Sequence, residues 1–387
     1  MSSLDFEHEL DLLREQSLLR RRKVADSACG PEVIVDGRPV LAFCSNDYLG
    51  LAAAPEIAEA LSTAAREHGV GSGASHLISG HHRLHQQLET RLAEFSGLAR
   101  TLTFSTGYMA NMAVIATLAG RGDAVFSDTL NHASLIDACR LSRAETHIYP
   151  HCDVTALANQ LEQSNSPRKL VVTDAVFSMD GDLAPLPELI DLCERHDALL
   201  VVDDAHGFGV LGTGGRGALS HFGIESPRIV YMGTLGKSAG VAGAFVGGSS
   251  NLVEWLLQKG RTYIFTTAAP PPIAAALIKA IDLVEHGNQR RTHLQHIIER
   301  FRTRLQTSRW KLLDSQTAIQ PLVIGSNDET LRVAETLMNE GLWAPAIRPP
   351  TVPAGSSRLR ISFSAAHTEA HVDRLIDALH RAESAAH

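Results

Sequence analysis

The sequence lacks several features that would assign it to a whole class of proteins. No apolar run reaches the roughly 18 residues that a membrane-spanning helix needs. The acidic, polar start MSSLDFEHEL matches neither a secretory signal nor an Arg-rich transit peptide. The formal net charge of -8 leaves no excess of basic residues to attract nucleic acid. We therefore expect a cytoplasmic protein that binds neither membranes nor nucleic acids.

Cysteine is also sparse, and its spacing argues against stabilisation by disulfides or by a structural zinc ion. The five cysteines include no C-x-x-C pair, so neither a disulfide framework nor a zinc knuckle is expected. A chain of 387 residues, 44% of them hydrophobic, can bury a large core without disulfides or metal ions. The pattern is typical of a reducing compartment.

Lysine is scarce too, with six copies among 35 basic residues. Lys237 stands apart because it lies in Tyr-Met-Gly-Thr-Leu-Gly-Lys-Ser-Ala-Gly, directly after an apolar run. A lysine that forms an imine with a flat cofactor needs a lowered pKa and room beside it. The small neighbours of Lys237 leave that room. A surface lysine in a glycine-rich turn is the alternative, and the local sequence alone does not decide between the two.

The order of apolar runs predicts the fold. From about residue 100, short apolar runs alternate with helical patterns, which predicts βαβ units and a mostly parallel sheet covered by helices. The runs are Thr101–Ser105, Ala124–Ser127, His147–Tyr149, Leu170–Val176, Leu199–Val202, Ile229–Met232 and Ala244–Val246. We predict an α/β fold with a helix over 5–25 and a short hairpin over 33–44 within residues 1–50. A large α/β domain in 51–285 and a smaller α+β domain in 286–387 are predicted to follow.

Polar residues follow one of these runs in a pattern that suits a nitrogen heterocycle. Asp203, Asp204 and His206 come at the end of Leu199–Val202. In a parallel sheet, ligands bind beyond the carboxyl ends of the strands. A carboxylate such as Asp203 can keep a pyridine nitrogen protonated, and His206 can turn back toward the same ring. Asp204 fits a helix N-cap or a supporting partner better. A metal site of these acids and His206 is the alternative.

Other candidates lie at the ends of neighbouring runs. Gly107 and Tyr108 open a helix whose N-terminal amides can bind phosphate. Thr234, three residues before Lys237, and Ser178 are placed to add hydroxyl groups. His132 begins another helix, where its ring can stack on a flat heteroaromatic ring or serve only as a cap.

Two further patterns are weaker. Gly212–Gly217 matches G-x-G-x-x-G, but it follows no clear strand and no acid lies about twenty residues later, so a dinucleotide site is not favoured. His81, His82 and His85 place two imidazoles one helical turn apart. Because no H-E-x-x-H glutamate accompanies them, we interpret them as a solvated helix face rather than a zinc site.

Together these segments resemble the α-oxoamine synthase family of fold-type I pyridoxal-phosphate enzymes. The resemblance covers nearly the whole chain and is carried by seven motifs in order: Phe43–Gly50, Gly71–Gly73, Gly107–Asn111, His132–Ser134, Val176–Asp182, Val202–Gly207 and Thr234–Lys237. One departure is mild: the family often has Gly-Phe-Gly after the lysine, whereas this chain has Ser238-Ala239-Gly240.

The resemblance implies a role for each matching residue. Lys237 would hold pyridoxal 5'-phosphate as an imine, Asp203 would pair with the pyridine nitrogen, His206 with the phenolic oxygen, and His132 would stack on the ring. The rest of the cofactor site would come from Gly107, Tyr108, Ser178 and Thr234. Substrate contacts would come from Arg20, Asn46, Thr351 and Arg360, and also from His132. Arg360 would hold an amino-acid carboxylate.

A motif in the C-terminal part of the chain resembles one member of this family in particular. Ala346–Gly355 contains R-P-P-T-V-P-A-G, the form of the family member that condenses L-alanine with a pimeloyl thioester. The thioester could be carried by coenzyme A or by acyl carrier protein. The resemblance also implies a homodimer. The alternatives are a family member that uses glycine and acetyl-CoA, and a nicotinamide-dependent oxidoreductase built on Gly212–Gly217.

Overall fold

The computed structural model describes residues 6–385, and the chain divides into two compact units. We call residues 49–178 and 183–291 the sheet unit. Residues 1–48, 179–182 and 292–387 form the terminal unit, so the N-terminal segment belongs to the same unit as the C-terminal segment.

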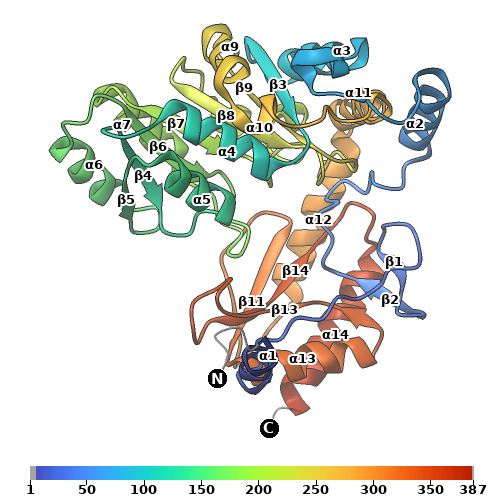
Figure 1. The fold of residues 1–387 in the computed structure, drawn as a ribbon. Helices are drawn as coiled ribbons and strands as arrows, with labels where there is room; N and C mark the ends of the chain where they lie inside the picture. Colours follow the sequence, from blue (N-terminus) through green and yellow to red (C-terminus); the bar gives the residue numbers. More distant parts are fainter. Residues whose placement is uncertain (1–5, 386–387) are drawn as a thin grey trace. The chain divides into compact units, whose positions relative to one another are not determined.

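A seven-stranded sheet in the order β3-β9-β8-β7-β6-β4-β5 forms the centre of the sheet unit (Figure 1). Of these strands, β9 alone runs antiparallel to its neighbours. The predicted apolar runs match all seven strands and the mostly parallel arrangement. The strands are β3 (Arg100–Phe104), β4 (Ala124–Asp128), β5 (Glu145–Tyr149), β6 (Lys169–Asp174), β7 (Leu199–Asp203), β8 (Ile229–Thr234) and β9 (Ala244–Gly248).

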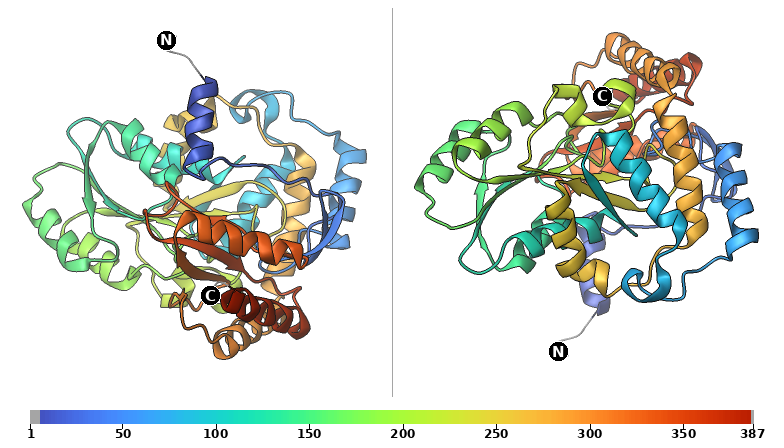
Figure 2. Two further views of the ribbon diagram at one scale, coloured as in Figure 1. Left: turned by 90° about the horizontal axis from the view of Figure 1, so that it is seen from below. Right: turned by 90° about the horizontal axis from the view of Figure 1, so that it is seen from above.

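Helices cover both faces of this sheet, which explains why its inner strands read as continuous apolar runs. Side chains of α4, α5 and α9 share one hydrophobic core with the sheet, and Figure 2 shows α7 on the opposite face. The helices of this unit are α2 (Pro55–His68), α3 (Arg83–Ser96), α4 (Gly107–Leu118), α5 (Ala133–Ser142), α6 (Val154–Gln163), α7 (Leu186–Arg195), α8 (Ala218–Phe222), α9 (Ser250–Lys259), α10 (Arg261–Ile264) and α11 (Pro271–Glu285). A short π-helix spans His76–Gly80, and helix α12 (Asn288–Arg304) crosses the boundary between the units.

The terminal unit contains two small sheets. The first has the order β1-β2-β12 and the second β10-β11-β14-β13. Their strands are β1 (Glu32–Val35), β2 (Arg38–Ala42), β10 (Lys311–Leu312), β11 (Ile319–Gly325), β12 (Leu342–Trp343), β13 (Ala346–Ile347) and β14 (Ser357–Ser362). Its other helices are α1 (Phe6–Glu15), α13 (Asn327–Asn339) and α14 (Glu369–Ala385).

The predicted hairpin is confirmed, because Val35 pairs with Arg38 across the two-residue turn Asp36-Gly37. Both turn residues have positive φ, 50° and 74°, as a type I′ turn requires. The helix predicted over 5–25 is wrong in length, since α1 ends at Glu15 and residue 5 lies outside the described part. Ser17 adopts a left-handed φ of 57°, which breaks the helix before the basic run at Arg20.

Within residues 6–385, no helix is both long and apolar enough to cross a membrane.

One buried histidine of the terminal unit makes folding sensitive to acid. His367 is 2% exposed, its Nε2 lies 2.9 Å from the carbonyl oxygen of Ala42, and its Nδ1 lies 2.9 Å from the amide nitrogen of Ser364. The Ser364 amide can only donate, so His367 is neutral with its proton on Nε2. Burial lowers the pKa of His367 from 6.5 to about 4.

We predict a loss of stability on acidification that depends on this residue. Between pH 6.5 and 4 the unfolded chain binds a proton that the folded chain does not, so the free energy of unfolding falls as the pH drops. The contribution of His367 is about 2 to 3 kcal/mol. Urea unfolding across this range should give a shallower pH dependence for His367→Gln than for the parent. An equal pH dependence in the two proteins would show that His367 does not titrate this way.

Candidate active site

The carboxyl edge of the central sheet gathers most of the predicted site residues. Strands β4, β6 and β7 end in Asp128, Asp174 and Asp203, and β8 ends in Thr234. Asp174 pairs with Asp203 across β6 and β7, so the strand ends are level. The loops beyond this edge therefore meet over one surface of the sheet unit.

Lys237 lies in the loop directly after β8. Its Nζ is 2.7 Å from Nε2 of His206, which follows β7. A Cβ at Gly236 would meet nothing closer than 3.9 Å, an ordinary van der Waals distance, so no close contact crowds this position beside the lysine. Gly240 is glycine for another reason: it has a φ of 71°, and a Cβ there would lie 2.6 Å from the backbone of Leu51 and Ala52.

Asp203 is a buried carboxylate at this edge, 3% exposed. Its Oδ1 accepts from the amide of Ala205 at 3.0 Å, and its Oδ2 accepts from Nδ2 of Asn111 at 2.7 Å. Both donors are neutral. The carboxylate is thus fixed in place while its charge remains available to a cationic group.

The adjacent acid, Asp204, is a structural anchor. Its Oδ2 accepts from the amide of Ala218 and from the hydroxyl of Tyr231, each at 2.7 Å. Burial raises the pKa of Asp204 from 3.8 to about 7. The two neighbouring carboxylates are therefore held by different partners, which supports the predicted supporting role of Asp204 and gives no support to a shared metal site.

His132 is the N-cap of α5. Its amide donates to Oδ2 of Asp174 at 2.6 Å, and its Nδ1 accepts from the amide of Ser134 at 3.2 Å. The side chain is exposed on one side, as a ring that stacks on a ligand must be. Desolvation by the surrounding protein lowers the pKa of His132. Lys237 acts in the same direction and Asp203 opposes it, so both residues lie close to this ring.

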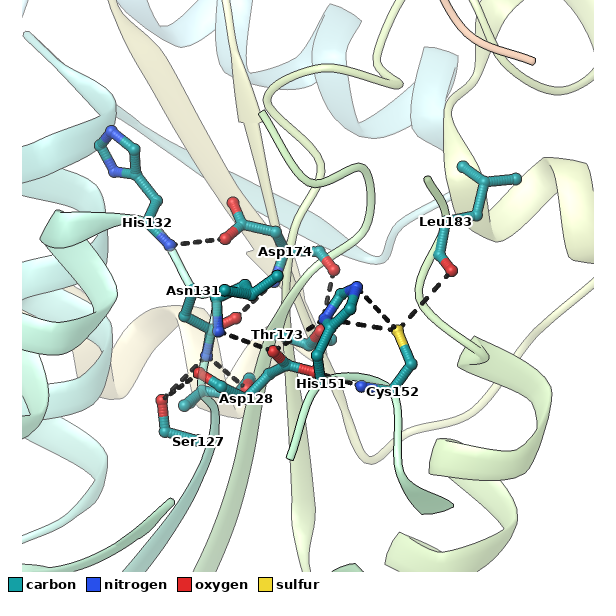
Figure 3. Close-up of polar contacts among 11 residues, drawn as sticks. Ser127, Asp128, Asn131, His132, His151, Cys152, Thr173, Asp174 and Leu183 are labelled. Atoms are coloured by element: carbon teal, nitrogen blue, oxygen red, sulfur yellow. Dashed lines mark hydrogen bonds and ion pairs between the residues drawn. The ribbon is translucent and has the colours of Figure 1, made fainter. Parts of the chain in front are cut away.

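Figure 3 shows how the loop that carries His132 is held. Nδ2 of Asn131 donates to Ser127 at 2.9 Å and to the carbonyl of Val172 at 2.8 Å, while its Oδ1 accepts from the amide of Asp174. Burial raises the pKa of Asp174 well above its usual range, and the charge of Asp203 adds to this. No pattern in the sequence indicates this role for Asp174, because it depends on contacts between loops that are distant in the chain.

Four smaller contributors are placed as follows. Gly107 is the first residue of α4, and Thr106 caps this helix through a bond from the amide of Met109. Tyr108 is 43% exposed and its hydroxyl donates to Asp137. Oγ1 of Thr234 donates to the carbonyl of Gly243 at 3.2 Å, and Ser178 is half-buried. Ser178 lies four residues beyond the end of β6 rather than directly after a strand, because β6 ends at Asp174.

Apart from His132, which lies in the sheet unit, the predicted substrate-binding residues lie in the terminal unit and form two groups. In the first, Nη1 of Arg360 donates to Oδ1 of Asn46 at 3.2 Å, and the guanidinium is 7% exposed. The second lines a small cavity and contains Arg20, Thr351 and Arg348. Arg348 was not among the predicted residues, although it belongs to the R-P-P-T-V-P-A-G stretch.

This cavity has a cationic lining. Burial lowers the pKa of Arg348, and the nearby charge of Arg20 lowers it further. Within the described residues, no ion pair joins either arginine to an acid. Two neighbouring guanidinium groups without a carboxylate favour binding of an anion.

The glycine-rich stretch Gly212–Gly217 forms a tight turn. Only the five-residue α8 follows it, and Cβ atoms at Gly212 and Gly215 would lie 2.6 and 2.5 Å from the backbone oxygens of Gly217 and Gly209. These glycines allow close packing of the chain against itself. The arrangement does not match a strand–turn–helix dinucleotide site.

The histidines at 81–85 differ from the predicted solvated helix face. His85 is 1% exposed, its Nδ1 accepts from the amide of His82 at 3.0 Å, and its Nε2 lies 2.8 Å from the carbonyl of Ala269. The prediction failed because α3 begins at Arg83 and turns His85 into the core. His76, His81 and His85 bring ring nitrogens within 4.8 Å of one another, but both nitrogens of His85 are engaged, which disfavours a metal ion there.

The geometry can now be set beside known proteins. Residues 38–379 match the family model described as aminotransferase class I and II. A protein of Azoarcus sp. named 8-amino-7-oxononanoate synthase is 61% identical over 98% of this chain and 97% of its own. A protein of the same name from Herminiimonas arsenicoxydans is 59% identical over 97% and 98%. The chain belongs to the aminotransferase class I and II family, among the 8-amino-7-oxononanoate synthases.

Solved structures agree on the fold of this family. A serine palmitoyltransferase of Sphingomonas wittichii superposes with a TM-score of 0.93 at 32% identity, covering 99% of this chain and 98% of that chain. The 8-amino-7-oxononanoate synthase of Francisella tularensis gives 0.78 at 29% identity, with coverages of 90% and 98%. Because several activities share one fold, the sequence identity of the curated relatives, rather than the superposition, assigns the chain among the synthases.

Proposed function

We propose that this chain condenses L-alanine with a pimeloyl thioester, releasing carbon dioxide, the free thiol and 8-amino-7-oxononanoate, a step of biotin biosynthesis. The single observation that carries the proposal is the identity of 61% to a full-length 8-amino-7-oxononanoate synthase. The cofactor is pyridoxal 5'-phosphate. We further propose that the reaction takes place in the cytoplasm, in line with the five free cysteines.

The residues at the carboxyl edge of the sheet fit this cofactor. Asp203 is a buried carboxylate that accepts hydrogen bonds from two neutral donors, and such a group suits a protonated ring nitrogen. The amine of Lys237 lies 2.7 Å from the imidazole of His206. This pair suits a cofactor with a carbonyl carbon, which the amine would bind, beside a phenolic oxygen, which the imidazole would contact. The N-terminal amides of α4 at Gly107 and Tyr108, with the hydroxyls of Ser178 and Thr234, suit a phosphate group.

Each side chain of the site would have its own role in the reaction. Bound pyridoxal phosphate supplies an electron sink for the negative charge that develops at the α-carbon of alanine. Lys237 would bind the cofactor covalently at rest and then, as a free amine, take the α-proton of alanine and later return a proton to the product. Asp203 would keep the ring nitrogen protonated throughout. His132 would hold the ring flat by stacking, and its lowered pKa keeps it neutral there.

The terminal unit would select the two substrates. Arg360 would bind the carboxylate of alanine through its planar guanidinium, with Asn46 fixing its orientation. We assign the cavity of Arg20, Thr351 and Arg348 to the distal carboxylate of the pimeloyl chain, because two arginines without an acidic partner favour an anion. This group would distinguish pimeloyl from an uncharged acyl chain, whether coenzyme A or acyl carrier protein carries it.

Two thioesters of equal chain length, one with and one without a distal carboxylate, test that assignment. Arg20→Gln should raise KM for a pimeloyl thioester by about tenfold or more, because one charged hydrogen bond is lost. KM for the heptanoyl thioester, which lacks the distal carboxylate, should stay unchanged. Arg22→Gln, at an exposed arginine two residues away, is the control and should alter neither value. Equal losses with both thioesters would refute the assignment.

We also propose that the enzyme is a homodimer. Exposed apolar side chains lie on two segments of the sheet unit, with Val70, Ile78 and Phe265 exposed by 78%, 81% and 71%. The segments adjoin, since the amide of Ala268 donates to the carbonyl of Ala74 at 3.0 Å. An exposed apolar patch of this kind supports the proposal that a second copy of the chain covers it. Light scattering should give twice the chain mass for the parent and a smaller mass for Phe265→Asp, whereas a monomeric parent would contradict the proposal.

The activity itself is tested by a substrate competition. Purified protein with pyridoxal phosphate should form 8-amino-7-oxononanoate, detected by mass spectrometry, from L-alanine and pimeloyl-CoA. Glycine with acetyl-CoA should give far less product. Preference for the second pair would assign the chain to the glycine branch of the family, and binding of a nicotinamide cofactor in place of pyridoxal phosphate would overturn the proposal.

A further inference from the structure

A buried asparagine joins two residues of the proposed cofactor site. Asn111 lies on α4 and is 0% exposed. Its Nδ2 is 2.7 Å from Oδ2 of Asp203 and 2.8 Å from Oγ of Ser134. Oγ of Ser134 in turn lies 2.8 Å from Nδ1 of His132. These four side chains form a continuous chain of hydrogen bonds inside the sheet unit.

The direction of every hydrogen bond in this chain can be worked out. A carboxylate can only accept, so Asn111 must present its NH₂ group to Asp203, and its second N–H points to Ser134. The Oδ1 atom of Asn111 is then left buried without a partner among residues 6–385, which marks the orientation as imposed by its neighbours. Ser134 accepts from Asn111 and donates its own hydrogen to His132.

The chain therefore fixes the tautomer of His132. Nδ1 of His132 accepts from the amide of Ser134 as well as from its hydroxyl, so it carries no proton. The proton of the neutral ring must sit on Nε2. One amide group thus acts on both the carboxylate that would face the ring nitrogen and the imidazole that would stack on the ring.

We propose that Asn111 is a positioning residue that holds Asp203 as an ionised partner for the cofactor's ring nitrogen and, through Ser134, locks His132 in the neutral Nε2–H form. The inference rests on the proposed function, because it assigns Asn111 a task toward pyridoxal phosphate. Asn111 touches neither substrate nor cofactor in this scheme. It acts through Asp203 and His132.

A purely structural role for Asn111 makes different predictions. A buried amide that only ties α4 to its neighbours would change stability when replaced and leave the bound cofactor unaltered. The test must therefore read the state of the cofactor and of His132 as well as turnover. Nitrogen NMR of cofactor labelled at the ring nitrogen reports its protonation, and NMR of the imidazole nitrogens reports the tautomer of His132.

Asn111→Leu removes both donors with little change in volume. We expect the dissociation constant for pyridoxal phosphate to rise and kcat to fall, each by about ten- to a hundredfold, because a hydrogen bond to a charged group is lost. KM for alanine should change little, and the ring nitrogen should be less protonated than in the parent.

Ser134→Ala keeps the test decisive if Asn111→Leu fails to fold. Ser134 and Ser142 are both buried serines of α5, so Ser142→Ala is the matched control. Ser134→Ala removes the hydroxyl and keeps only the amide as a donor to Nδ1, so it should raise the share of the Nδ1–H tautomer of His132, whereas Ser142→Ala should not. The proposal is overturned if Asn111→Leu or Ser134→Ala matches the parent in cofactor affinity, ring protonation and His132 tautomer. If the unaltered protein does not bind pyridoxal phosphate at all, the proposed function fails instead.

Discussion

Replacing Lys237 by alanine is expected to lower turnover of L-alanine with a pimeloyl thioester by roughly ten-thousandfold or more. The variant loses both the covalent attachment of the cofactor and the amine that would move the α-proton of alanine. Because no close contact crowds Gly236 beside the lysine and His206 stays in place, the cofactor should still bind, though more weakly. Steady-state kinetics and the visible absorbance of the protein with added pyridoxal phosphate measure both effects.

Lys259→Ala is the matched control for this variant. Lys259 is an exposed lysine on α9 whose ammonium group lies 5.5 Å from the ring of Trp255. Its removal should leave turnover near that of the parent. A Lys237→Ala protein that retains a tenth or more of the parent activity would mean that another group carries the reaction.

Replacing Asp203 by asparagine should lower kcat by about a hundred- to a thousandfold. The substitution keeps the size of the side chain, but a neutral amide cannot keep the ring nitrogen protonated. An amide at this position also faces the NH₂ group of Asn111, which requires the carboxamide to turn its oxygen toward Asn111. KM for both substrates should change far less than kcat.

Asp204→Asn is the control for this second variant. Asp204 is equally buried and adjacent in sequence, but it holds Tyr231 and Ala218 rather than the site. Its replacement should shift the midpoint of thermal unfolding and leave kcat within a few-fold of the parent. If Asp204→Asn and Asp203→Asn lose activity equally, the two carboxylates do not have the separate roles described.

The sequence predicted the sheet well because inner parallel strands are buried on both faces and read as apolar runs. The same rule located Asp203, His206 and Lys237, since residues just beyond such runs collect at one edge of the sheet. The turn Asp36-Gly37 was predictable for a local reason: few residue pairs accept two positive φ angles.

Other features depend on contacts that no local pattern encodes. The end of α1 at Glu15 is set by the left-handed Ser17, and His85 turns inward because α3 begins at Arg83. Asn111 and Ser134 lie within quoted motifs, yet their hydrogen bonds join α4, α5 and β7, which are separated by up to 92 residues. A single sequence carries no direct signal of such pairings.

The central claim is that Lys237 binds the cofactor covalently. Borohydride converts the carbon–nitrogen double bond between a lysine and pyridoxal phosphate into a stable single bond, and peptide mapping by mass spectrometry then locates the modified lysine. We predict stoichiometric modification of Lys237 and none of Lys23, Lys169, Lys259, Lys279 or Lys311. Label on any of those five, or no label on Lys237, would contradict it.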